Sequence, residues 1–125
     1  MSWQMRDDAP VYAQLVEHIK LAIISGEYAL GSRMPSVREL AAEAGVNPNT
    51  MQRAFAELER DGLVLTQRTA GRTVTEEAER VEEAKRHLAA AAIQTFWVNM
   101  RRLGYAQNEA LQLLKDSGKT KKEEA

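Results

Sequence analysis

Two short helical patterns joined by a tight turn constrain the fold of this chain more than any other feature. The first begins at Ser36, where "SVRE" has capping-box spacing and Glu39 is expected to reach back to the cap. The second has Asn47 as its N-cap and Pro48 in the first helical position, and ends before Gly62. The connection "AGVN" has almost no slack. The pair therefore predicts a helix-turn-helix.

Other periodic stretches surround this unit. Residues 10–25 predict a helix, since apolar side chains recur there at helical spacing: Tyr12, Leu15, Val16, Ile19, Ala22 and Ile23. Two β-branched stretches, 63–67 and 72–75, predict a small hairpin with Gly71 in its turn. A long helix over 76–103 and a shorter one over 106–117 follow.

The expected fold class is mainly α (α+β). A winged helix-turn-helix domain is expected over residues 10–76, because the hairpin follows the helix-turn-helix where a wing belongs. A helical dimerisation segment is expected over residues 77–117. The polar end, residues 118–125, is expected to be a disordered tail.

The long predicted helix is apolar along two edges and so needs two partners. One edge consists of Val81, Ala84, Leu88, Ala91, Thr95 and Val98, and the other of Ala89, Ile93, Phe96, Met100 and Leu103. The short helix can cover one side and a second copy of the chain the other. The alternative is a monomer whose long helix folds back over residues 10–25. The dimer is favoured because this segment is too thin to hold its own core. The residues predicted to dimerise are Val81, Leu88, Ala91, Thr95 and Val98.

Composition excludes several classes of function. The 125 residues include no cysteine, which removes disulfides and cysteine-based zinc or nucleophile sites. The histidines lack metal-ligand spacing, and no catalytic or phosphate-loop motif is present, so no metal, cofactor or enzyme activity is expected. The longest apolar run, "LAAAAI", is far shorter than the about 20 residues that span a bilayer, and no secretory signal precedes it. A cytoplasmic protein without membrane partners is expected.

Charge placement points to a nucleic-acid partner although the net charge is only −1. Residues 47–53 and 63–75 contain arginines and no acid. With Met51, Ala54, Phe55 and Leu58 inward, the second helix of the pair turns out three polar residues: Asn49, Gln52 and Arg53. Such residues meet base edges in the major groove, Asn and Gln pairing with adenine and Arg with guanine or phosphate. The alternative is a solvated polar face.

Three further arginines are candidates for DNA contact. Arg38 lies in the first turn of its helix, where it can meet a phosphate or a base; the alternative is an ion pair with Glu39 or Glu43. Arg68 and Arg72 flank the hairpin tip and can reach the minor groove or backbone. For these two the alternative is an ordinary solvated turn.

The stretch "PVYAQLVEHIKLAIISGEYALGSRMPSVRELAAEAGVNPNTMQRAFAELERDGLV" closely resembles the DNA-binding domain of GntR-family bacterial regulators, over residues 10 to about 75. A long helix followed by a short one resembles the YtrA-like subfamily, whose C-terminal helices chiefly dimerise. The resemblance implies that Arg38 contacts DNA. It also implies recognition-helix contacts at Asn47, Pro48, Asn49, Thr50 and Gln52. The wing departs from the family's "RGxGTFV", reading "RTAGRTV", with Thr69 in place of the first glycine.

The chain is therefore expected to be a sequence-specific DNA-binding regulator. The expected form is a homodimeric repressor on an inverted-repeat operator, and the resemblance implies a transporter operon. The predicted DNA-binding residues are Ser36, Arg38, Asn47, Pro48, Asn49, Thr50, Gln52, Arg53, Arg68, Thr69, Gly71 and Arg72. Operator DNA and a second copy are the expected partners, with room for a small-molecule effector. The alternative is a ligand-sensing or protein-interaction module, with activity in C-terminal helices that place Phe96, Trp97 and Tyr105 around a pocket.

Overall fold

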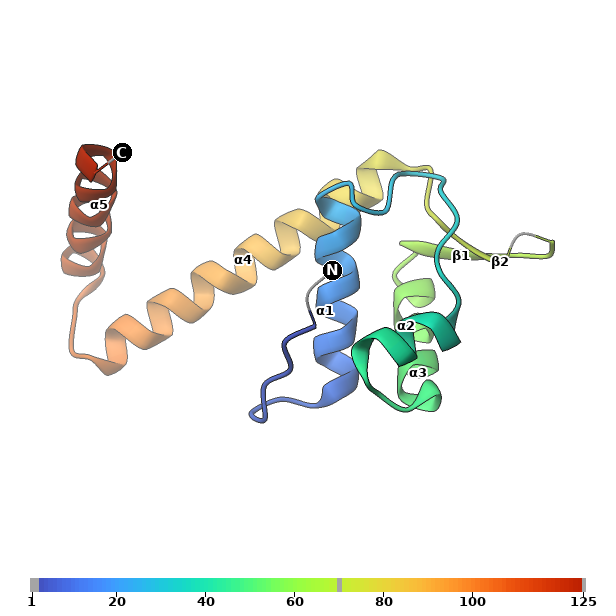
Figure 1. Cartoon of the computed structure of the whole chain (residues 1–125). Coiled ribbons are helices and arrows are strands. Elements are labelled where there is room, and N and C mark those ends of the chain that lie inside the picture. The colour runs from blue at the N-terminus through green and yellow to red at the C-terminus, as the bar shows by residue number, and fades with distance from the viewer. Residues whose placement is uncertain (1–2, 70, 125) are drawn as a thin grey trace. The chain divides into compact units, whose positions relative to one another are not determined.

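The structure is a computed structural model that describes residues 3–69 and 71–124 (Figure 1). The elements follow the order α1 (Val11–Ile24), α2 (Val37–Ala44), α3 (Pro48–Arg60), β1 (Val64–Gln67), β2 (Gly71–Val74), α4 (Ala78–Arg102) and α5 (Gln107–Glu124). The chain forms two compact units, Met1–Lys85 and Arg86–Ala125. The boundary falls within α4. The order of helices and strands is the one that the sequence predicts.

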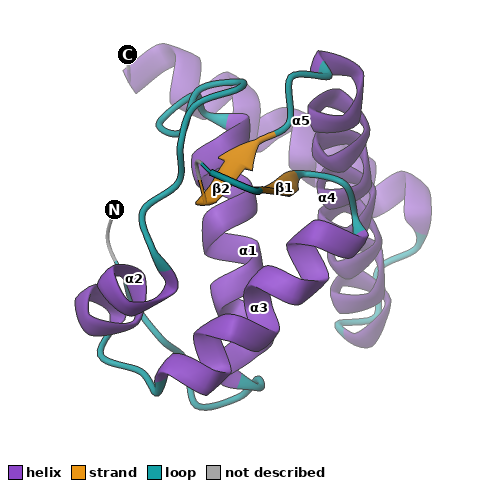
Figure 2. Ribbon diagram, turned by 90° about the vertical axis from the view of Figure 1, so that its right-hand side faces the viewer, coloured by secondary structure: helices purple, strands orange, loops and turns teal. Residues whose placement is uncertain are grey.

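The core of the first unit forms where α3 packs on both α1 and α2 (Figure 2). Four α3 side chains at helical spacing are fully buried: Met51, Ala54, Phe55 and Leu58. They pack with the apolar faces of the two other helices, represented by Leu15, Ile19 and Leu40. The predicted inward face of α3 is therefore confirmed, and its opposite face is left to solvent.

Gln14 is a buried polar residue that the apolar pattern of α1 does not reveal. Its side-chain oxygen accepts a bond from the backbone N–H of Arg6 at 2.6 Å, and its Nε2 donates to the carbonyls of Arg6 and Ala9 at 2.7 and 2.9 Å. These bonds satisfy the buried amide, as a folded protein requires. They also fasten the segment before α1 to that helix, where Trp3 lies against the ring of His18 at a centroid distance of 5.4 Å.

Both predicted N-caps are present. The Ser36 hydroxyl accepts the backbone N–H of Glu39 at 3.0 Å, and Oδ1 of Asn47 accepts that of Asn49 at 2.7 Å. Only half of the predicted capping box forms, because in the described part of the chain the Glu39 carboxylate makes no bond back to Ser36. Gly45 closes α2 in the left-handed conformation, with φ of 71°. The short turn between α2 and α3 is thus fixed at both ends.

The hairpin is antiparallel and rooted in the core. Its register runs from Val64 opposite Val74 at the root to Gln67 opposite Gly71 near the tip, and both valines are fully buried. Residues 32–34 pair with the outer edge of β2 through backbone hydrogen bonds. One of these is the bond from the Val74 N–H to the Ser32 carbonyl, at 2.8 Å. The wing therefore lies in the first unit, and near its root β2 is hydrogen-bonded on one edge to β1 and on the other to residues 32–34.

The start of α4 belongs to the first unit. Val81 and Ala84 pack against the core of that unit, since a helix leaving the wing needs an apolar surface to lie on. Val81 was predicted to dimerise, and the structure instead places it in its own domain.

In the second unit α5 follows α4 after a short turn, and Ala110 of α5 is buried. The helix continues to Glu124, so the structure has helix where a disordered tail was expected over 118–125; residue 125 lies outside the described residues. Gly118 does not adopt the positive φ that ends helices elsewhere in the chain, and the Lys- and Glu-rich sequence after it suits a helix. Within the described residues, no helix is long and apolar enough to cross a membrane.

Candidate nucleic-acid interface

A groove of about 740 Å³ gathers side chains from α2, α3 and the wing on one side of the first unit. Its lining includes Tyr28, Arg33, Ser36, Arg38, Gln52 and Arg72. Thr66 and Gly71 complete the wing side of it. Three elements whose residues were predicted separately to meet DNA thus face a common space.

Arg38 stands exposed at the N-terminal end of α2. It forms no ion pair with Glu39 or Glu43 in the described part of the chain, so the alternative proposed for it does not occur. Among the described hydrogen bonds, the backbone N–H groups of Val37 and Arg38 also have no acceptor, while that of Glu39 is capped by Ser36. Unpaired N–H groups and the positive end of the helix dipole favour an anion here.

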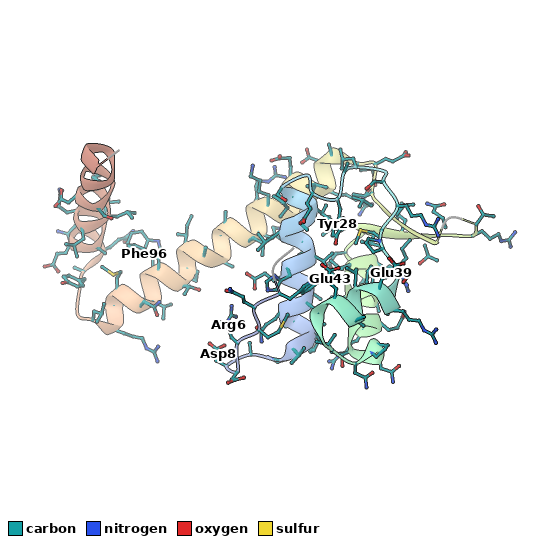
Figure 3. The ribbon with its side chains drawn as sticks, in the orientation of Figure 1. Arg6, Asp8, Tyr28, Glu39, Glu43 and Phe96 are labelled. Atoms are coloured by element: carbon teal, nitrogen blue, oxygen red, sulfur yellow. The ribbon has the colours of Figure 1, made fainter. Side chains whose placement is uncertain are left out.

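Tyr28 forms a wall of the groove. Burial raises the pKa of Tyr28, and the neighbouring carboxylates of Glu43 and Glu27 raise it further, because each disfavours a phenolate. Tyr28 and Glu43 are both labelled in Figure 3. Tyr28 lines the groove together with Arg33 and Arg38.

The exposed face of α3 carries the side chains suited to reading bases. Asn49 and Gln52 are exposed, and their amide side chains have no hydrogen-bond partner among the described residues. Exposed Ala56 lies one turn beyond Gln52 and leaves room for close approach. Folding does not use these amides, so they are available for base edges.

The backbone N–H groups at the start of α3 are not open to an anion in the way those of α2 are. Pro48 has no N–H, that of Asn49 donates to Asn47 Oδ1, and that of Thr50 donates to the Asn47 carbonyl at 3.0 Å. Asn47 thus uses its side-chain oxygen as the cap. A helix that caps itself in this way satisfies the donors that a phosphate would need. The free donors lie at α2 instead.

Thr69 at the tip of the wing stands where the family pattern has its first glycine. Arg68 and Thr69 are exposed. No described residue other than glycine has a positive φ, so Thr69 does not adopt a glycine-like conformation; the positive φ, 70°, lies at Gly71. Gly71 pairs with Gln67 as the first residue of β2.

Arg72 is tied to its own domain. Its Nε lies 2.6 Å from Oε1 of Glu59 on α3, and its guanidinium carbon is 5.1 Å from the centre of the Phe55 ring. Arg68, by contrast, forms no ion pair within the described residues. Of the two predicted wing cations, Arg68 is free in this structure and Arg72 braces the wing against α3.

Arg33 is a groove residue that the sequence reasoning missed. It is exposed, lines the groove and forms an isolated β-bridge with Thr73 of the wing. A signal for it existed, because residues 28–38 contain two arginines and no acid. The same pattern had singled out residues 47–53.

Arg53 and the predicted dimerisation residues lie outside this groove. The Arg53 guanidinium lies over the Tyr12 ring of α1, 3.6 Å from its centroid. In the second unit, Leu88 and Val98 are half-buried, and Ala91 and Thr95 are exposed. Large apolar side chains stay exposed on that unit: Ile93, Leu103, Leu111, Leu113 and Leu114.

Comparison with known proteins agrees with this geometry. A family model for "Bacterial regulatory proteins, gntR family" matches residues 11–74. YhcF of Bacillus subtilis (strain 168), an uncharacterized HTH-type transcriptional regulator, is 37% identical over 115 residues, covering 92% of this chain and 95% of that protein. The HTH-type transcriptional repressor YtrA of the same organism is 40% identical over 73 residues, covering 58% of this chain and 56% of that protein.

A solved structure extends the likeness to the C-terminal helices. A GntR family transcriptional regulator from Listeria monocytogenes superposes with a TM-score of 0.81 at 36% sequence identity, covering 90% of this chain and 98% of that one. The resemblance to YtrA-like regulators seen in the sequence is thereby confirmed. The chain belongs to the GntR family of bacterial regulatory proteins and is a DNA-binding transcriptional regulator, not an enzyme.

Proposed function

We propose that the chain is a homodimeric repressor that binds an inverted-repeat operator, with one α3 in the major groove of each half-site. The observation that carries the proposal is the groove that joins Arg38, Gln52 and the wing on one side of the domain. Half-site centres would lie about one helical turn apart, roughly 34–36 Å, or slightly more. Such a regulator acts on chromosomal DNA in the cytoplasm.

The side chains divide into two kinds of contact. Asn49 and Gln52 offer free amides to base edges, which specify sequence. Arg38, with the unpaired N–H groups at the start of α2, offers an anion site for a phosphate, which positions the domain. Arg68, which is exposed at the wing tip, would meet the minor groove or the backbone beside it.

The direct test of DNA binding is a gel-shift assay with the protein's own promoter region. The proposal predicts a shift that survives excess random duplex DNA. A shift that random DNA abolishes at equal concentration would leave only non-specific binding.

Dimerisation is proposed because the second unit exposes more apolar surface than two helices can bury. Ile93 is 56% exposed and Leu103 is 71% exposed, and leucines 111, 113 and 114 add to this surface. A second copy would remove it from water, at about 25 cal/mol per Å² of apolar area. Sedimentation at micromolar concentration should give twice the chain mass of 14.0 kDa. A single 14.0 kDa species would contradict the dimer.

Repression is supported by the relative YtrA, which is named a repressor, and the transporter operon rests on family resemblance. Deleting the gene should raise expression from its own promoter and from the promoter of the proposed transporter operon. A fall in expression on deletion would make the protein an activator.

A second candidate function is ligand sensing by the C-terminal helices. A groove of about 310 Å³ in the second unit has two aromatic walls, Trp97 and Tyr105, with Arg101 beside them. Its volume falls at the lower end of the range of small-molecule pockets, which begins at about 300 Å³. As the sole function it requires no sequence-specific DNA shift, so the gel-shift assay separates the two candidates.

A further inference from the structure

Arg53 is the one predicted DNA-binding residue of α3 that is held by another helix. Its guanidinium lies 3.6 Å from the centre of the Tyr12 ring, in the first turn of α1. Tyr12 is half-buried and Arg53 is exposed. The arginine is therefore fixed on one face and open to solvent elsewhere.

Arg53 lies over the Tyr12 ring although a carboxylate is near it in the sequence. Glu57 lies one turn further along α3, at the spacing where opposite charges pair on a helix, yet Arg53 forms no ion pair in the described part of the chain. A ring takes up only the flat face of a guanidinium. The N–H donors all point outward in the guanidinium plane, so they keep their capacity for an anion.

The position of the stack complements that of Arg38. α3 packs on both α1 and α2, and Figure 2 shows α3 crossing in front of α1. Gln52 lines the groove on the α2 side together with Arg38, whereas the next residue, Arg53, turns toward α1. A recognition helix that lies in a major groove has a sugar–phosphate backbone on each side of it.

We propose that Arg53 binds a phosphodiester of duplex DNA on the α1 side of α3, and that Tyr12 is the positioning residue that holds its guanidinium. Arg38 and Arg53 then contact the two sugar–phosphate backbones that border the major groove of the DNA. This assigns Arg53 to positioning rather than to reading bases. The proposal rests on the proposed docking of α3 and adds to it a site that includes α1.

The test measures binding by fluorescence anisotropy over a series of salt concentrations. The probes are a fragment of the protein's own promoter and a random-sequence duplex of equal length. The variants are Arg53→Ala, Tyr12→Leu, which removes the ring, and Tyr12→Phe, which keeps the ring and removes the hydroxyl. Lys85→Ala is the control, since it removes one exposed charge from α4. Thermal unfolding checks that each variant is folded.

Arg53→Ala should lower the slope of log affinity against log salt by about 0.9 on both probes, as loss of one phosphate contact does. Tyr12→Leu should weaken both probes several-fold and add little in the Arg53→Ala background. Tyr12→Phe should bind like the wild type. Lys85→Ala should leave the slope unchanged. If Tyr12→Leu does not fold, Arg53→Ala and Tyr12→Phe still decide the matter.

Three results would overturn the proposal while leaving DNA binding intact. The first is an unchanged slope in Arg53→Ala with loss on the promoter probe alone, which would make Arg53 a base reader. The second is a Tyr12→Phe variant as weak as an arginine deletion, which would transfer the role to the hydroxyl. The third is wild-type affinity in Tyr12→Leu. Failure of the wild-type protein to bind either probe would instead remove the proposed function, and this site with it.

Discussion

Glu59 of the recognition helix and Arg72 of the wing are joined by an ion pair of 2.6 Å, and the two side chains are only 32% and 23% exposed. Glu59→Gln should lower the free energy of unfolding by about 1–2 kcal/mol, because the Arg72 guanidinium, largely removed from water, loses its counter-charge and keeps at most a neutral acceptor. Urea denaturation measures the loss.

The matched control is Glu77→Gln. It breaks the pair between Glu77 and Arg80, whose side chains are 66% and 50% exposed. That change should cost less than about 1 kcal/mol, as exposed pairs do. Equal losses in the two variants would show that the Glu59–Arg72 pair does not brace the wing.

Gly71 of the wing should not tolerate a side chain without a loss of stability. A Cβ there would meet no atom, but φ is 70°, which L-residues adopt at a cost. Gly71→Ala should therefore destabilise the protein by about 1–2 kcal/mol. Gly118→Ala, at a helical glycine with equally open space, should cause no loss. A neutral Gly71→Ala would mean that the wing turn rearranges easily.

Tyr28 should make the protein lose stability in alkali. Its pKa is raised in the folded state by burial and by Glu43 and Glu27, so folding favours the protonated phenol. That contribution is fully present below the unfolded pKa of about 10 and declines as the pH rises past it. In Tyr28→Phe the free energy of unfolding should therefore fall less steeply than in the wild type as the pH rises above about 10. Parallel stability curves for wild type and variant would exclude Tyr28 as the cause.

Gln52 should contribute to the choice of sequence more than to affinity in general. Gln52→Ala should weaken the protein's own promoter fragment by about 1–3 kcal/mol and leave random duplex DNA nearly unaffected, since one bidentate base contact is lost. The ratio of the two affinities, measured in one buffer, is the relevant quantity. Equal loss on both DNAs would make Gln52 a positioning residue.

Local signals predicted much of this fold. Ser36 and Asn47 were identified as caps because capping depends on residues two or three positions away, and both accept the expected backbone N–H groups. The buried face of α3 followed from helical spacing in the same way, through Met51 and Phe55. The expected tail over 118–125 differed from the structure because polar composition was taken as a sign of disorder, whereas a Lys- and Glu-rich stretch also suits a helix.

Contacts between distant residues were not predictable by these means. The Arg72–Glu59 pair, the Arg53–Tyr12 stack and the bonds of Gln14 to the segment before α1 join positions that no periodicity links. They depend on how the helices and the wing pack. For this reason three arginines that were all predicted to contact DNA have different surroundings. Arg53 lies over a tyrosine ring, Arg72 forms an ion pair, and Arg68 is exposed without an ion pair among the described residues.

Arg38 provides the most direct test of the proposed interface, because it lies at the start of α2 where the unpaired backbone donors are. The measurement is the affinity of Arg38→Ala for the protein's own promoter fragment across a salt series, with Lys85→Ala as the control. The variant should lose about 1–3 kcal/mol at physiological salt and show a salt slope lower by about 0.9. An Arg38→Ala variant that binds as tightly as the wild type at physiological salt would contradict the assignment of this groove to DNA.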